Sequence, residues 1–293
     1  MKKKSKSSGS LLSYIGELDS DSSFGLLHNK KENLFLGKFD PAGIMEIMEK
    51  VGFVSHLNKK GFSDIKLTIE VDDSLINYLK VYFGDVKPDN LLLDLRLSES
   101  KFVPDKKFFE EYNDVVTFDM VVIEWLSTQD PKGNFTSDRP QLPGQKSPGL
   151  GALKYCFDMM YAVGKEVIKD GFLDIPDHGH GAVMYSKKFK FFDPAHEGVL
   201  RAILRDLKKY PLSDISWGMI TNTIIDVYKD KPHVYDPSEQ IFYISNRMRK
   251  YFHSKKYQTV FKKYYKIKKF RFDYDRMVEK RAELLKSKSI LEL

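Results

Sequence analysis

The sequence predicts a mixed α/β (α+β) fold, in which a sheet with flanking helices is followed by a mostly helical C-terminal extension. Three observations support this class. Apolar and polar residues alternate over short segments before residue 130, helical spacing begins after Gly151, and it dominates beyond Pro194. Of the 293 residues, 42% are hydrophobic and 30% are charged, which supplies one or two cores. We expect an N-terminal arm over residues 1–36, an α/β core over 37–194 and the extension over 195–293.

The first expected element is a short helix after Asp40. Asp40 can cap the helix, and Pro41 suits its first position. Gly52 would end it. The residues on its apolar face are Ile44, Ile47, Met48 and Val51.

Strands and one strong helix complete the expected core. Residues 65–71, 91–97 and 115–126 have strand-like patterns, whereas 74–83 fits a helix or a strand. A helix is expected from Gly151 to about Asp170, with apolar residues on one face. Short strands are expected at 172–176 and 188–193.

Cysteine content and hydropathy exclude two classes of protein. The single Cys156 excludes an internal disulfide framework. The longest uncharged stretch, 215–225, has eleven residues, whereas a membrane-spanning helix needs about 20. The basic first ten residues lack the apolar run of a signal peptide. We therefore expect a soluble, cytoplasmic protein without membrane insertion.

The segment from Lys146 to Ala152 is the first candidate binding site. It ends a Pro-rich connection and leads directly into the strong helix. Gly149 and Gly151 would let the backbone approach a ligand, and the N–H groups at the start of the helix favour an anion such as phosphate. A tight turn that only packs the helix against the sheet is the alternative.

This segment resembles the acyl-CoA-binding turn of the GNAT acyltransferase family. The family pattern is Gln or Arg, two residues, Gly, any residue, then Gly or Ala, and here Lys146 takes the first place. The resemblance covers residues 115–193, because a later Asn, Tyr, Lys, Gly-Phe pattern is also partly matched. The matching downstream residues are His178, Tyr185, Lys187 and Phe189.

The resemblance implies transfer of an acyl group from acetyl-CoA or another acyl-CoA to a small-molecule or peptide amine. It places the cofactor against Lys146, Gly149, Leu150, Gly151 and Ala152.

In the implied fold, the strands before the turn and after the helix splay apart to admit the acyl arm. Tyr185 matches the family's usual acid at the leaving thiolate. The attacking amine must lose a proton, and Glu124 lies among apolar residues that favour proton uptake, so it is the candidate base, expected to face Tyr185 across the gap. Pairing of Glu124 with a Lys or Arg, and a core role for Tyr185, remain alternatives.

His178 and His180 form a second group of candidates. On an extended chain, His-x-His places both rings on one face, as in some metal sites. No third ligand is indicated by the spacing. We expect substrate contact or an ordinary loop in preference to metal, and a metal-dependent hydrolase is the third hypothesis for function.

A basic segment forms the third candidate site. Residues 247–271 contain eleven Lys or Arg and no acidic residue, although the net charge of the whole chain is only +7. An amphipathic helix would bury the stripe Tyr257, Val260, Phe261, Tyr264 and Tyr265 and turn the lysines outward. A solvated helix face is one interpretation. A nucleic acid or an acidic partner bound at 247–271, on a non-catalytic α/β scaffold, is the alternative function.

Overall fold

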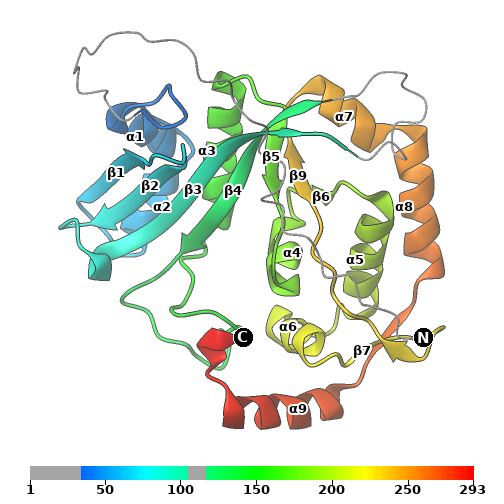
Figure 1. Cartoon of the computed structure of the whole chain (residues 1–293). Helices are drawn as coiled ribbons and strands as arrows, with labels where there is room; N and C mark the ends of the chain where they lie inside the picture. The colour runs from blue at the N-terminus through cyan, green and yellow to red at the C-terminus, as the bar shows by residue number, and fades with distance from the viewer. Residues whose placement is uncertain (1–33, 105–116) are drawn as a thin grey trace, which may run out of the picture. The chain divides into compact units, whose positions relative to one another are not determined.

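Seven strands form one mixed sheet in the computed structural model of the chain, which describes residues 34–104 and 117–293. Every neighbouring pair is antiparallel except β4 and β5, which are parallel. This confirms the mixed α/β fold with flanking helices (Figure 1). The strands lie in the order β1 (Ile65–Val71), β2 (Asn77–Phe83), β3 (Leu91–Phe102), β4 (Phe118–Thr128), β5 (Gly171–Asp174), β9 (Gln240–Tyr243) and β6 (Lys190–Phe191).

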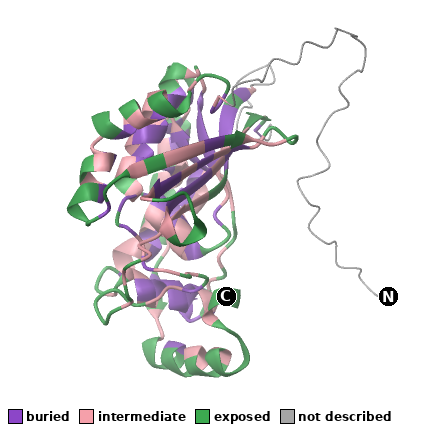
Figure 2. Cartoon of the chain, turned by 90° about the vertical axis from the view of Figure 1, so that its left-hand side faces the viewer, coloured by how far each residue is buried: buried purple, intermediate pink, exposed green. Residues whose placement is uncertain are grey.

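Helices pack on both faces of this sheet. Successive strand residues point to opposite faces, so Phe172 joins the core beneath α1, α2 and α3, whereas Leu173 joins the core beneath α7 and α8. Figure 2 shows buried stretches along the strands of the sheet and exposed stretches on the outer surfaces of the helices. The helices on the two faces are α1 (Pro41–Lys50), α2 (Phe53–Lys59) and α3 (Leu153–Glu166), and α7 (Asn246–His253) and α8 (Lys255–Ile267).

The remaining elements surround a third core. A three-stranded sheet joins β10 (Phe270–Phe272), β7 (Ile224–Asp226) and β8 (Lys231–Pro232). The other helices are α4 (Gly179–Tyr185), α5 (Pro194–Asp206), α6 (Leu212–Ile220) and α9 (Tyr274–Ser287), with single 3₁₀ turns at Pro88–Asn90 and Ile290–Glu292. Within the described ranges, no helix is both long and apolar enough to span a membrane.

Local sequence signals explain the elements that were expected. Asp40 caps α1 by accepting a hydrogen bond from the Gly43 N–H at 2.7 Å, and Ile44 and Met48 are fully buried. The ambiguous segment 74–83 contains strand β2, whose Leu79 and Val81 lie in the core.

Two of the expected boundaries are wrong. Phe35 and Leu36 are buried, and the Leu36 N–H donates to the Asn77 side chain at 2.7 Å, so the core begins before residue 37. Strand β9 lies between β5 and β6, so residues after 194 complete the main sheet and do not form a separate extension. Residues 1–33 of the expected arm, and 115–116 of the expected strand, lie outside the described residues.

Asp170 fixes β5 between its two neighbours. Its carboxylate accepts a hydrogen bond from the Asp119 N–H at 2.8 Å and a paired contact from the Arg247 guanidinium, whose Nε lies 2.6 Å away. Its carbonyl accepts from the N–H groups of Ile244 and Ser245. Asp170 therefore connects the start of β4 with the residues that follow β9. These contacts lie at the end of the sheet where the parallel pairing of β4 and β5 begins.

Candidate functional site

Strands β4 and β5 separate after a short parallel stretch. Only Met120–Val122 of β4 pairs with β5, through 171–173, while β4 continues to Thr128. Figure 1 shows the two strands side by side at one end and diverging toward the other, where α4 follows β5. Beyond Val122, β4 no longer pairs with β5, and this break in the strand pairing is called the gap below.

Glu124 forms a β-bulge where the strands separate. Leu97 pairs with Ile123 and Arg96 pairs with Trp125, so Glu124 is the extra residue in β4. Its carboxylate accepts a hydrogen bond from the Ser98 hydroxyl at 2.5 Å. Glu124 is exposed, so the apolar surroundings expected from its sequence neighbours are not found. The bulge turns the Glu124 side chain to a different face from the one that regular strand alternation predicts.

Glu124 and Tyr185 approach the gap from opposite faces of the sheet. Ser98, the partner of Glu124, is paired with Val122, which packs in the core beneath α7 and α8. Tyr185 belongs to the core beneath α1, α2 and α3. The expected arrangement, with Glu124 directly facing Tyr185, is therefore wrong. The carboxylate whose charge acts on the Tyr185 hydroxyl is Asp174.

Asp174 is a site residue that the sequence analysis missed. It is the last residue of β5 and has a partner in β9 but none in β4. Burial, followed by the negative charges of Asp177 and Glu124, raises the pKa of its carboxyl to about 7. The available signal was a single carboxylate in the apolar run from Phe172 to Pro176, the same pattern that had drawn attention to Glu124.

Tyr185 presents a hydroxyl beside Asp174 from a rigid position. Its ring stacks on Phe189 at 5.0 Å between centroids and meets the edge of Phe157 at 5.7 Å. Burial and then the Asp174 carboxylate raise the pKa of Tyr185 well above its ordinary value of 10.0, so the hydroxyl keeps its proton. Tyr185 is a core aromatic, as the alternative interpretation expected.

The turn before α3 is held by its carbonyl groups. The Asp130 N–H donates to the Pro148 carbonyl at 2.7 Å, Arg139 donates to Gly149 at 2.7 Å, and the His56 ring contacts the Leu150 carbonyl at 3.0 Å.

The opposite side of this turn is open. Gly151 has a φ of +67°, and no heavy atom lies within 4 Å of the position that a Cβ would occupy. Ala152, at the N-cap of α3, provides no side-chain cap, and the side chains of Leu150 and Ala152 are buried. Lys146 is exposed and makes no ion pair with a described residue. The first N–H groups of α3 are thus available to an anion.

The two candidate histidines are stacked at the start of α4. Helix α4 begins at Gly179, so the extended His-x-His geometry is wrong, and the rings lie 5.4 Å apart between centroids. His180 contacts the Ser216 hydroxyl at 3.0 Å, and burial followed by the charge of His178 lowers the pKa of His180 to about 4. Among the described residues, no group of three or more His, Cys, Asp or Glu is arranged to hold a metal ion.

His178 lies close to Gly144, in the connection that leads to the turn before α3. Its Nε2 is 3.7 Å from the position that a Cβ of Gly144 would occupy. The Gly144 N–H donates to the Ile290 carbonyl at 2.7 Å, so the segment after α9 also packs on this connection. The structure therefore places His178 beside Gly144 and the half-buried His180 against Ser216 of α6.

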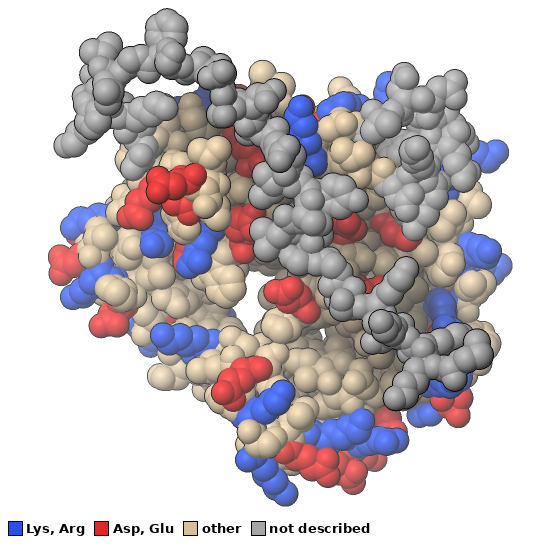
Figure 3. Space-filling model, viewed as in Figure 1, with Lys and Arg blue, Asp and Glu red and all other residues tan. Residues whose placement is uncertain are grey.

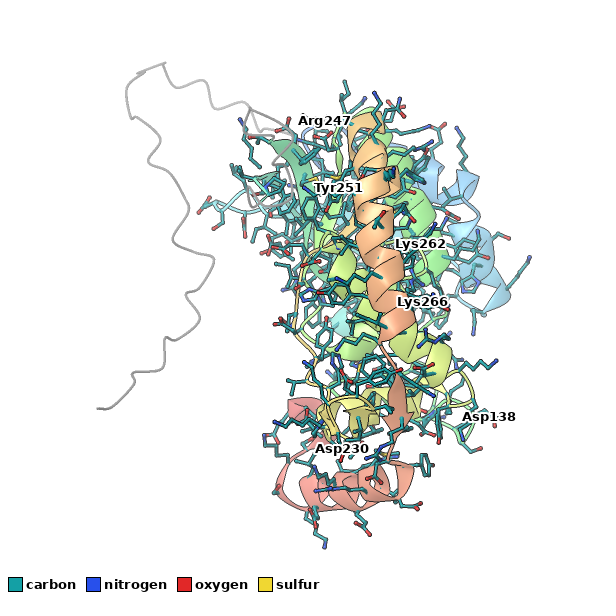
Figure 4. All side chains as sticks on the ribbon, turned by 90° about the vertical axis from the view of Figure 1, so that its right-hand side faces the viewer. Asp138, Asp230, Arg247, Tyr251, Lys262 and Lys266 are labelled. Atoms are coloured by element: carbon teal, nitrogen blue, oxygen red, sulfur yellow. The ribbon has the colours of Figure 1, made fainter. Side chains whose placement is uncertain are left out.

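The basic segment forms α7, α8 and β10. Tyr257 is buried and Phe261 and Tyr265 pack inward, which confirms the amphipathic helix. Three of the eleven cations pair with carboxylates elsewhere in the chain: Arg247 with Asp170, Lys268 with Asp226 and Arg271 with Asp230. The exposed lysines of α8 are Lys255, Lys256, Lys262, Lys263 and Lys266, and Figure 4 shows α8 at the surface with Lys262 and Lys266 along it.

Comparison with known protein families and with curated proteins finds no match to this chain.

Proposed function

We propose that this chain is a GNAT-like N-acyltransferase that moves an acyl group from an acyl-CoA thioester to an amine. One observation carries the proposal. The connection from the free end of β4 leads through the turn at Gly149 and Gly151 into the uncapped start of α3, and β5 then returns in parallel to form the other wall of the gap. The proposed anion site and the gap thus lie at the two ends of the connection between β4 and α3.

The turn suits a diphosphate. N–H groups at the start of α3 and the positive end of its dipole attract the anion, and the missing side chain at Gly151 lets it approach. Lys146, exposed beside the turn, adds a positive charge. These contacts would leave the acyl arm to extend toward Glu124 and Asp174.

Acyl transfer needs groups that handle two protons. The amine must be neutral before it attacks the thioester carbon, and the departing thiolate is stabilised by a proton. Tyr185, which holds its proton firmly in a buried setting, is suited to supply the second. Asp174, whose carboxyl has a pKa raised to about 7, is suited to accept the first, whereas Glu124 lies on the face of the sheet opposite Tyr185.

The test is ligand protection in a matched pair of variants. CoA should raise the melting temperature of the wild-type protein at concentrations where AMP does not. Gly151→Val should abolish this effect, while Gly37→Val, at a φ of +65° with equally open surroundings, should retain it. Each variant should lose about 1–3 kcal/mol of stability from backbone strain. Equal protection of a folded Gly151→Val protein would eliminate the site, and absence of CoA protection in wild type would refute the proposed function.

A polyanion-binding function is the second candidate, and the exposed face of α8 favours it. Its five lysines point away from the core that anchors the helix, and none of them forms an ion pair with a described residue. The aromatic stripe is packed inward, so stacking on bases would not contribute, and binding would depend on charge alone.

A further inference from the structure

Strand β1 leaves a long edge of the main sheet open. It stands first in the sheet order, and in the described part of the chain it pairs only with β2. Figure 1 shows β1 at the outer side of the sheet, and Figure 3, in the same view, shows basic and acidic side chains interspersed there. The other edge strand, β6, has two residues, whereas β1 has seven, with no Pro and no irregularity in its pairing. A long, regular edge of this kind is a template for another strand.

Half of the backbone groups of β1 point to this open edge. Hydrogen-bonded and non-hydrogen-bonded residues alternate along an antiparallel pair. At the two ends of β1, Gly84 donates its N–H to the Asp64 carbonyl at 2.9 Å, and Asp72 donates to the Ile76 carbonyl at 3.1 Å. The even-numbered residues of β1 therefore bond to β2. The residues that direct N–H and C=O outward, where no bond to another described segment uses them, are Ile65, Leu67, Ile69 and Val71.

The side chains of β1 are complementary to those of a second β1 running in the opposite direction. The strand reads IKLTIEV over residues 65–71, with Thr68 at its centre. When Thr68 lies opposite Thr68 of a second copy, Lys66 of each copy lies opposite Glu70 of the other, and the apolar residues lie opposite apolar residues. Opposite charges paired across neighbouring strands stabilise a sheet, whereas like charges destabilise it.

The two faces of β1 suit this pairing. Ile69 is buried in the core beneath α1, α2 and α3, and Ile65 and Leu67 pack against that core while partly exposed. A second strand would cover these apolar side chains and extend the core. Successive residues point to opposite faces, so Lys66 and Glu70 lie on the other face, where both are exposed. Glu70 forms no ion pair with a described residue, and Lys66 reaches only the exposed Asp64, at 3.2 Å.

We propose that two copies of this chain associate through β1, antiparallel about a two-fold axis at Thr68, so that their main sheets become one continuous sheet. Each outward-facing residue would donate one backbone hydrogen bond to the second copy and accept one. Lys66 and Glu70 would then face each other in non-hydrogen-bonded pairs, in which side chains approach most closely. The association is independent of the proposed acyl transfer, because it uses the edge of the sheet farthest in strand order from β9 and β6.

Other registers of the same two strands are less favourable. A shift by one residue would place the apolar face of one copy beside the charged face of the other. A shift by two residues would place Lys66 opposite either Thr68 or Asp72. The Asp72 carboxylate already accepts three hydrogen bonds within its own hairpin. The register centred on Thr68 is therefore the one that gives both charged residues a free partner.

The first test is the mass of the full chain in solution. Sedimentation equilibrium at low ionic strength should show a species with twice the 34.1 kDa of one chain, in a proportion that rises with protein concentration. Added salt should weaken the association, because Lys66 and Glu70 are exposed and their attraction is screened.

Charge reversal tests the register. Lys66→Glu alone, or Glu70→Lys alone, would place like charges opposite each other twice in a two-fold dimer, so each should weaken self-association about tenfold or more. The variant carrying both changes should associate as the wild type does. In an equimolar mixture, the two single variants offer each other only opposite charges, so they should form a heterodimer at least about tenfold more readily than either pairs with itself. Lys101→Glu, the same change at an exposed position of β3, should leave association unchanged.

The outcomes separate this interface from the alternatives. A wild-type chain that stays monomeric up to its solubility limit would overturn the proposal and indicate that β1 serves another partner or none. A dimer that neither single variant weakens would place the interface elsewhere on the surface. Weakening without recovery in the double variant or in the mixture would overturn the Thr68 register. CoA protection of the monomer is measured separately, so none of these results decides the acyltransferase proposal.

Discussion

Replacing Asp174 by Asn should stabilise the protein, and the gain should grow with pH. Asn has nearly the same size but no charge, so it removes the cost of ionising a buried carboxyl. The pKa of Asp174 is raised from 3.8 to about 7, and each unit corresponds to about 1.4 kcal/mol. The full effect is therefore about 4 kcal/mol.

The sign follows from proton uptake. A folded-state pKa above the unfolded value means that the folded protein binds more protons between those values, so wild-type stability falls as pH rises from about 4 to 7. The loss is complete above the folded pKa. Between pH 4.5 and 8, the stability advantage of Asp174→Asn should grow by about 3 kcal/mol.

The assay is urea unfolding of both proteins at pH 4.5, 6 and 8. Other ionisable groups cancel in the difference between them, and Asp89→Asn serves as the exposed control, for which little change is expected at any pH. A difference that does not vary with pH, or that favours wild type at pH 8, would refute a buried, charge-crowded Asp174. A residue that costs this much stability in its ionised form is retained for a reason other than folding.

Three further predictions concern packing and charge. Asp170→Asn should cost about 2–3 kcal/mol at pH 7, because it breaks the Arg247 pair, whose Arg side chain is 51% exposed and so partly screened. Burial acts to raise the pKa of Asp170, but hydrogen bonds from Arg247, Ser245 and the Asp119 amide outweigh it and lower the pKa. The stability lost by Asp170→Asn, measured by urea denaturation, should therefore shrink as pH falls below 4. Gly198→Ala should destabilise the protein by about 1–3 kcal/mol, although alanine ordinarily strengthens a helix, because the new Cβ would lie 2.7 Å from the Tyr264 Cβ. An increase in the urea midpoint would contradict the close packing of α5 on α8. Changing Lys262, Lys263 and Lys266 to Gln should alter the free energy of unfolding by less than about 0.5 kcal/mol, because all three are exposed. If α8 binds nucleic acid, the same change should flatten the salt dependence of binding by about one unit per lost phosphate contact. Absence of nucleic-acid binding by the wild type at low salt would refute that function.

Residue-level signals identified most of the local structure. Asp40 and Pro41 marked the start of α1, and the aromatic stripe at 257–265 marked the buried side of α8. These features depend on spacing along one helix or strand, which the sequence records directly. The turn before α3 was found for the same reason, because the positive φ of Gly151 favours glycine at that position.

Contacts between segments far apart in the sequence decided the domain boundaries and the ion pairs. The β9 strand enters the sheet beside β5 from more than sixty residues away, so the expected boundary at residue 194 fails although each local pattern after it is helical or short. Ion pairs of Arg247, Lys268 and Arg271 likewise depend on carboxylates brought in from distant elements.

By itself the sequence determined the α/β class and the glycine turn before α3, and it indicated the carboxylates worth examining. Only the tertiary structure decided which carboxylate occupies the gap. Glu124 and Asp174 both follow apolar runs, but a bulge turns Glu124 outward to Ser98, while the end of β5 leaves Asp174 half-buried, where its charge acts on Tyr185. Solvation of a carboxylate is set by the elements that pack around it, and these are supplied by β4, α4 and the segment before β9, none of which its sequence neighbours specify.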